Sequence, residues 1–216
     1  LKDNAEVFLQ DSLTAPKVSL SPSTLMFPKQ VLNTTSAPIS TLLINEGNTT
    51  LQINKVGIAT NNSSDFSVSF NGCGSMLAPG ARCTLEATFT PTASGNRGSL
   101  MQVRDSGVNS PQNVTLSGVG TAISLSPTGI PFGNQKVGTT SAAQNITLTN
   151  VGKLLVSFTG SKISISGAKS SIAAGASCTI SVSFKPTATG RRTASVSVSD
   201  NGGGSPQKVS LVGTGT

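Results

Sequence analysis

The chain has 216 residues, of which 36% are hydrophobic and 11% charged, with a formal net charge of +7 and a mean hydropathy of +0.07. This composition excludes an intrinsically disordered chain, which combines low hydrophobicity with a high net charge. The apolar residues occur in short runs separated by Gly, Pro, Asn, Ser and Thr, and no run approaches the roughly 18 apolar residues of a membrane-spanning helix. We therefore expect one or two globular domains without a transmembrane segment.

Residues 1–16, LKDNAEVFLQDSLTAP, precede the part of the chain that is repeated. Because Leu1 is not an initiator Met, we expect either that a leader was removed or that the chain is part of a longer one. Val7, Phe8 and Leu9 stand in the stretch AEVFLQ, which suits a β-strand. Three interpretations stay open: the segment is the remnant of a preceding repeat, it folds onto the first domain, or it inserts as an added strand into a neighbouring subunit. In the last case these three residues are candidate assembly contacts.

The remainder of the sequence consists of two similar copies. Residues 19–22, SLSP, recur as residues 124–127 at a shift of 105, whereas Cys83 recurs as Cys178 at a shift of 95. The change of shift is a deletion of ten residues in the second copy, between about 158 and 170. A period of about 100 residues is too long for a solenoid repeat and has the size of one immunoglobulin-like sandwich. The sequence therefore predicts two such domains in series, residues 17–121 and 122–216.

Hydrophobic alternation indicates the fold class. Cys83, Leu85, Ala87 and Phe89 alternate with polar residues, and the second copy repeats this pattern from Cys178 onward. A period of two with one apolar face is typical of a half-buried strand. Helix-forming residues are scarce, and turn residues separate the short apolar runs, so we expect an all-β protein of two tandem β-sandwiches.

Leu42 and Ile44, in the stretch STLLIN, align with Thr147 and Thr149 of the second copy. Because the two threonines alternate with apolar neighbours, we expect these positions to point outward. Leu42 and Ile44 would then form an apolar strip on the outer surface of the first domain, which makes them candidate assembly contacts. The alternative is local cover by a loop or by residues 7–9.

Three stretches carry a resemblance to a known family: SLSPTGIPFGNQKVGTTSAAQNITLTNVG, LAPGARCTLEATFTPTASG and SPQNVTLSGVGT. They resemble the Hydin-like or ASH-type immunoglobulin-like domains, which recur in tandem in bacterial "choice-of-anchor D" surface proteins. The resemblance implies sandwiches related to PapD-like and major-sperm-protein domains, and a role in scaffolding, adhesion or assembly. The second copy departs from the pattern, because it lacks the element present as Asp65-Phe66 in the first copy and lacks the first cysteine.

Cys73 and Cys83 lie ten residues apart, on either side of a Pro-Gly turn that folds the chain back. The spacing matches the family, and the resemblance therefore favours a disulfide over two buried thiols in a cytosolic protein. Cys178 has Ala168 at the position of its expected partner, so we expect an unpaired thiol that acts as a small hydrophobe, or else an intermolecular disulfide. The chain contains no histidine, and we expect neither a Cys/His metal site nor a cofactor.

The positive charge is concentrated in the second copy. Residues 122–216 contain eight Lys and Arg side chains against Asp200 alone, whereas residues 1–121 are balanced. Lys185, Arg191 and Arg192 lie near one strand end and are candidate contacts for an acidic glycan or another polyanion. The alternative is a solvated surface that keeps the chain in solution. Aromatic residues are scarce, so we expect no specific recognition of nucleic acid.

The sequence shows no pattern typical of catalysis. It has no histidine, no closely spaced carboxylate pair and no nucleotide-binding glycine motif, and we expect no enzyme. The leading hypothesis is a secreted or surface structural protein, bacterial by its resemblance, that acts as a stalk, an adhesin or a self-assembling fibre subunit whose partners are copies of itself or other surface proteins. The alternatives are a module that binds an acidic polysaccharide through the second domain, and an intracellular scaffold.

Overall fold

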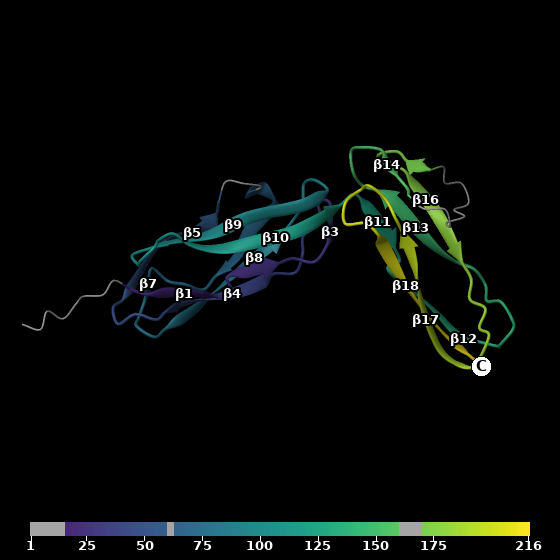
Figure 1. Ribbon diagram of the computed structural model, residues 1–216, viewed down its shortest axis with the longest axis horizontal. Helices are drawn as coiled ribbons and strands as arrows, with labels where there is room; N and C mark the ends of the chain where they lie inside the picture. Colours follow the sequence, from purple (N-terminus) through teal and green to yellow (C-terminus); the bar gives the residue numbers. More distant parts are fainter. Residues whose placement is uncertain (1–15, 60–62, 160–169) are drawn as a thin grey trace, which may run out of the picture.

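The computed structural model describes residues 16–59, 63–159 and 170–216, and they form two β-sandwiches in succession along the chain (Figure 1). Nothing longer than a single 3-10 turn (η1) interrupts the strands in these ranges, so no helix there is long and apolar enough to cross a membrane. The all-β, immunoglobulin-like fold expected from the alternating sequence is confirmed.

The first sandwich contains β1 to β10. One sheet has the order β1-β4-β8-β6, and the other has the order β2-β10-β9-β5-β7, with β3 also paired to β10. The elements of this sandwich are β1 (Val18–Ser21), β2 (Thr24–Met26), β3 (Gln30–Val31), β4 (Ile39–Asn45), β5 (Leu51–Ile58), η1 (Ser63–Asp65), β6 (Phe66–Asn71), β7 (Met76–Leu77), β8 (Arg82–Phe89), β9 (Gly95–Asp105) and β10 (Gln112–Thr121).

The second sandwich contains β11 to β18. Its described strands form one sheet of order β11-β13-β16, a second of order β12-β18-β17, and the short pair β14-β15. The strands are β11 (Ile123–Ser126), β12 (Gly129–Gln135), β13 (Gln144–Asn150), β14 (Val156–Ser157), β15 (Ser171–Ile172), β16 (Ser177–Val182), β17 (Gly190–Val198) and β18 (Gln207–Gly215).

Each sandwich has its own apolar core, built from the inward residues of the alternating strands. In the first, Leu43 and Leu85 of one sheet belong to the same buried cluster as Met101 of the other. In the second, Ile146 and Leu148 of β13 are fully buried in a separate cluster with Val198 and Val209 of the facing sheet. At about 25 cal/mol per Å² of apolar surface removed from water, these two clusters are the main source of stability for the fold.

The two sandwiches differ most where the second copy is ten residues shorter. In the first, β5 pairs along β9 through five residues, from Ile53 opposite Asp105 to Ile58 opposite Met101. In the second, the corresponding pairing begins with a bridge between Phe158 and Asp200, and the described chain stops one residue later.

Candidate functional site

A disulfide joins Cys73, which follows β6, to Cys83 at the start of β8, with the two Cα atoms 5.1 Å apart. The turn between the two cysteines includes Gly80, whose φ of +73° is easily reached only by glycine. The bridge therefore fixes this turn to the edge of the sheet. Cys178, on β16, is a free and half-buried thiol. Burial raises the pKa of the Cys178 thiol, which lowers its thiolate fraction and hence its reactivity.

Lys29 connects the two sandwiches. Its Nζ donates hydrogen bonds to the carbonyl oxygens of Gly204, at 2.9 Å, and Pro206, at 3.2 Å, in the turn between β17 and β18. The backbone N–H of Ala122 donates to the carbonyl oxygen of Gly202 in the same turn, at 2.7 Å. A glycine-rich hairpin of the second sandwich is thus held against the end of the first.

Two glycines of this hairpin are required by the close approach of the sandwiches. Gly203 has a φ of +88°, and a Cβ atom there would lie 2.5 Å from the carbonyl oxygen of Gly120 in the first sandwich. A Cβ atom on Gly204 would collide with the aliphatic part of Lys29. The equivalent positions in the first repeat hold Val108, which is exposed, and Asn109. The hairpin residues of the second repeat therefore suit this contact, and those of the first do not.

The charges near this contact are partly buried. Burial raises the pKa of the Asp200 carboxyl, against the opposing effects of the Gly202 backbone N–H, the Gln207 side chain and the charge of Lys29. Burial also lowers the pKa of Lys29, while Asp200 acts in the other direction. Lys29 and Asp200 thus stabilise each other's charged form across the contact.

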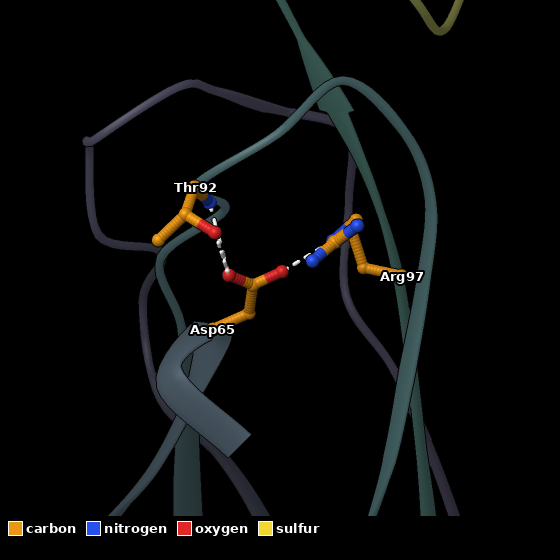
Figure 2. Close-up of polar contacts among 3 residues, drawn as sticks. All are labelled: Asp65, Thr92 and Arg97. Carbon is orange, nitrogen blue, oxygen red and sulfur yellow. Dashed lines mark hydrogen bonds and ion pairs between the residues drawn. The ribbon is translucent and has the colours of Figure 1, made fainter. Parts of the chain in front are cut away.

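Asp65 is the centre of a buried polar network in the first sandwich (Figure 2). Its Oδ1 accepts hydrogen bonds from the backbone N–H of Thr92, at 3.0 Å, and from the Thr92 hydroxyl, at 2.6 Å. Its Oδ2 forms a short ion pair with Nε of Arg97. Burial alone would raise the pKa of Asp65, but the hydrogen bonds from Thr92 and Arg97 together hold that pKa below its usual value. The network ties η1 to the start of β9.

Phe66, the next residue, fills the adjacent end of the first core. Its ring stacks on Phe89 with centroids 4.9 Å apart, and it contacts Phe27 at 5.8 Å. All three rings are buried. The Asp65-Phe66 pair therefore supplies one charge and one ring to the space between the two sheets of the first sandwich.

The second sandwich has a cavity at the equivalent place. Its volume is about 140 Å³, and its walls include Phe132, Phe184, Arg192 and Leu211. Phe132 and Phe184 are the counterparts of Phe27 and Phe89, and their ring centroids are 5.7 Å apart. Within the described chain, no third ring contacts them.

Of the three predicted anion contacts, the structure brings two to this cavity. Lys185 and Arg192 both line it, whereas Arg191 is the neighbouring residue on β17 and does not. All three side chains are exposed. Arg192 occupies the repeat position of Arg97, and its guanidinium donates to the carbonyl oxygen of Thr189 at 3.2 Å. None of the described carboxylates forms an ion pair with it.

Leu42 and Ile44 lie on β4, between β1 and β8, and both are half-buried. They alternate with the buried residues Thr41, Leu43 and Asn45, so they point to the outer face of the sheet. The other predicted assembly contacts, Val7, Phe8 and Leu9, lie outside the described residues.

Sequence reasoning noted the missing Asp-Phe element but not its consequence. Because Arg97 and Arg192 are related by the same shift of 95 as the two cysteine strands, the second repeat keeps the arginine and loses its carboxylate. That signal was available in the alignment of the copies. The contact between Lys29 and the glycine-rich hairpin was not, because 175 residues separate Lys29 from Gly204 and no periodicity links them.

Comparison with known proteins agrees with this fold. The family model for the HYDIN/CFA65/VesB-like Ig-like domain matches residues 121–214, the second sandwich. The expected resemblance is therefore confirmed for that half of the chain at the level of the HYDIN/CFA65/VesB-like Ig-like domain. A comparison with curated proteins finds no match.

Two solved structures illustrate the similarity. A protein of unknown function from Porphyromonas gingivalis W83 is 15% identical over 91% of this chain and 99% of its own, with a TM-score of 0.39. The ASH/PapD-like domain 7 of human CEP192 is 18% identical over 49% of this chain and 86% of its own, with a TM-score of 0.36.

Proposed function

We propose that this chain is a non-catalytic structural protein of the bacterial surface or extracellular space, whose two immunoglobulin-like modules form part of a stalk, adhesin or fibre. The observation that carries this proposal is the joint between the modules. Lys29 donates hydrogen bonds to the hairpin of the second sandwich, and Gly203 and Gly204 allow the close approach of the two sandwiches. This contact suits a stiff spacer better than a pair of independent domains. The coarser similarity to HYDIN/CFA65/VesB-like Ig-like domains is compatible with such a role.

The disulfide supports the proposed location. Disulfides persist in oxidising compartments and are rare in the cytosol. Titration of free thiols in the denatured protein, isolated under conditions that block exchange, tests this point. One free thiol, that of Cys178, agrees with a secreted or surface protein; three free thiols indicate the intracellular scaffold instead.

Within this role, we propose that residues 1–16 act as a donor strand that links one copy of the chain to the next. An extended segment that adds a strand to an exposed sheet edge is a common mode of assembly. Comparison of the full chain with a chain that lacks residues 1–16 by sedimentation velocity tests the proposal. Loss of concentration-dependent oligomers on deletion supports it, and unchanged oligomers remove it.

The second candidate function is binding of an acidic polysaccharide or another polyanion. It is favoured by the position of Lys185 and Arg192 on the wall of one cavity, with Arg191 beside them. Retention on an anionic polysaccharide column that falls with salt, and that is lost when all three residues are changed to Glu, would support this function. If the protein elutes from the anionic column at the same time as from an uncharged matrix, this function is excluded.

A further inference from the structure

A groove of about 740 Å³ lies on the outer face of the first sandwich, over β5, β9 and β10, which lie side by side in Figure 1. Residues that alternate with the buried positions of these strands point outward and face the groove. They include Lys55 and Gly57 of β5, Gln102 and Arg104 of β9, and Thr115 and Ser117 of β10.

Two positive charges lie directly opposite each other at one end of this groove. Lys55 and Arg104 are paired residues of β5 and β9, which places their Cβ atoms about 5 Å apart. Both side chains are exposed, and among the described residues neither forms an ion pair with a carboxylate. Like charges that face each other on neighbouring strands are destabilising. An anionic group bound between the two side chains would remove this repulsion.

The positive charge of the groove is local. Residues 1–121 contain seven basic and seven acidic side chains, so it does not follow from a basic first half of the chain. Asp105, the neighbour of Arg104, is buried on the inner face of β9, where its Oδ1 accepts a hydrogen bond from the backbone N–H of Gly107 at 2.7 Å. The outward positions of β5, β9 and β10 hold no Asp or Glu. The charged pair therefore has no counter-ion on these strands.

Beyond the charged end, the groove is lined by neutral groups that form hydrogen bonds. Gln102 lies two residues from Arg104 along β9, or about 7 Å, and Thr115 contributes a hydroxyl group from β10. Gly57 pairs with Gln102 and carries no side chain, and the Lys55 Cε atom lies 3.8 Å from the place that a Cβ atom of Gly57 would take. The Lys55 side chain thus runs along the groove, over a low floor.

A ligand in this groove is recognised by side chains and not by the backbone. β9 is paired on both sides, with β5 and β10, and β10 is paired with β9 and β2. A peptide that binds by strand addition needs a free sheet edge, which these two strands do not offer. No aromatic residue lines the groove, so it has no platform on which the bases of a nucleic acid stack. Amide and hydroxyl groups beside a cationic pair suit a ligand rich in hydroxyls that carries one acidic group.

We infer that this groove binds an acidic oligosaccharide, with the carboxylate of one sugar between Lys55 and Arg104 and neutral sugars along Gln102 and Thr115. A guanidinium group binds a carboxylate through two parallel hydrogen bonds, and the lysine ammonium adds a further donor. The second repeat has Ser197 and Ser199 at the positions of Gln102 and Arg104, so the site is specific to the first sandwich. It is distinct from the cations of the second sandwich proposed above and does not depend on fibre formation.

Titration of the isotope-labelled full chain, followed by the amide chemical shifts, tests the inference with defined sugars. Sialyllactose and glucuronosyl-xylotriose each carry one carboxylated sugar followed by neutral sugars, and lactose and xylotriose are their neutral counterparts. We expect an acidic probe to bind in about the millimolar range or tighter, with shifts in β5, β9 and β10. Its neutral counterpart is expected to bind at least about tenfold more weakly, the effect of losing a charge-assisted hydrogen bond.

Two variants separate the groove from the charge. Arg104→Ser introduces the residue of the second repeat and is expected to weaken binding of the acidic probe at least about tenfold. Gly57→Val fills the floor, leaves both cations in place and is expected to weaken binding as much. Among the described residues, a Cβ atom at this position has only the Lys55 Cε within 4 Å, and valine suits a strand, so the fold is retained.

The matched control lies in the second sandwich. The triple variant Lys185→Glu, Arg191→Glu and Arg192→Glu changes the total charge more than Arg104→Ser does but leaves the groove intact, and we expect a change in affinity of less than about twofold, since salt screens distant charges. Loss of binding in the triple variant, with unchanged affinity in Arg104→Ser, would place the site in the second sandwich and support the second candidate function instead.

The remaining outcomes overturn the inference. Weakening by Arg104→Ser but not by Gly57→Val indicates attraction to an exposed charge without a groove. Equal affinity for the acidic and neutral sugars contradicts the role of the charged pair. If neither acidic probe shifts the amide signals of β5, β9 and β10 at millimolar concentration, the groove does not bind such sugars, and the proposed fibre function is unaffected.

Discussion

Lys29 of the first sandwich and Gly204 of the second are joined by a hydrogen bond of 2.9 Å from Nζ to the carbonyl oxygen, across 175 positions of sequence. Lys29 lies in the chain between β2 and β3, and the carbonyl group belongs to a hairpin in which Gly203 and Gly204 have positive φ. This hydrogen bond holds the end of the first sandwich close to the hairpin of the second. It also links the electrostatics of the joint to Asp200, which lies at the base of the same hairpin.

Replacement of Gly203 by Val, the residue at the equivalent position of the first repeat, is expected to open the joint. The new side chain would collide with the backbone of Gly120, and a φ of +88° costs a β-branched residue on the order of 1–3 kcal/mol. Small-angle scattering should show a broader distribution of interdomain distances. Val108→Gly is the matched control and should leave the scattering unchanged; the same result for Gly203→Val would contradict the importance of this contact.

Removal of the Arg97 partner from Asp65 is expected to destabilise the first sandwich strongly. Asp65 is fully buried, and a buried carboxylate left without its cation typically costs about 3–5 kcal/mol. Urea unfolding of Arg97→Gln measures this loss. Arg192→Gln, the equivalent change in the second repeat, should cost less than about 1 kcal/mol, as for an exposed charge. Equal losses of unfolding free energy in Arg97→Gln and Arg192→Gln would contradict the difference between the buried ion pair of Arg97 and the exposed Arg192.

The pH dependence of stability in acid is expected to follow the protonation of the Asp65 carboxylate. Its pKa is depressed in the folded protein, so its contribution is present above the pKa of the unfolded chain, about 3.9, and is lost as the pH falls through the folded value. Thermal unfolding of the wild type should therefore show a loss of stability of the first sandwich below about pH 4 that is smaller in Asp65→Asn. Burial raises the pKa of Asp105, so that group contributes in the opposite sense, and Asp105→Asn should leave the acid-side loss in place.

The disulfide is expected to stabilise the first sandwich only. A bridge that closes a loop of this length contributes about 2–3 kcal/mol in the loop-entropy account. The double variant Cys73→Ala with Cys83→Ala should lose that amount in calorimetry, in the transition of the first sandwich. Cys178→Ala should instead affect the second transition, because Cys178 packs against the other core. A shift of both transitions by the disulfide variant would indicate that the sandwiches unfold as one unit.

Much of the architecture was predictable because the chain is duplicated. The strand from Cys83 to Phe89 was recognisable by its period of two and its repetition at Cys178, and β8 agrees with that prediction to within one residue. In the second copy, β16 ends at Val182, before Phe184. There the alternation continues past the strand, so pattern alone overestimates its length.

The interactions between repeats were less accessible to sequence reasoning. The stretch DNGGGSPQ, residues 200–207, indicates only a turn in the sequence, since nothing local shows that Gly203 meets Gly120 or that Gly204 meets Lys29. The cavity near Phe184 reflects a ring that is absent from the second repeat. A missing residue produces no periodic pattern that sequence analysis could detect. It becomes visible only when Phe66 is seen to occupy the same place in the first sandwich.

Electron micrographs of the full chain at high concentration test the account most directly. The account predicts filaments in which the two-module unit repeats head to tail, and their disappearance in the chain that lacks residues 1–16. Isolated two-lobed particles at every concentration, or filaments that persist after this deletion, would contradict it.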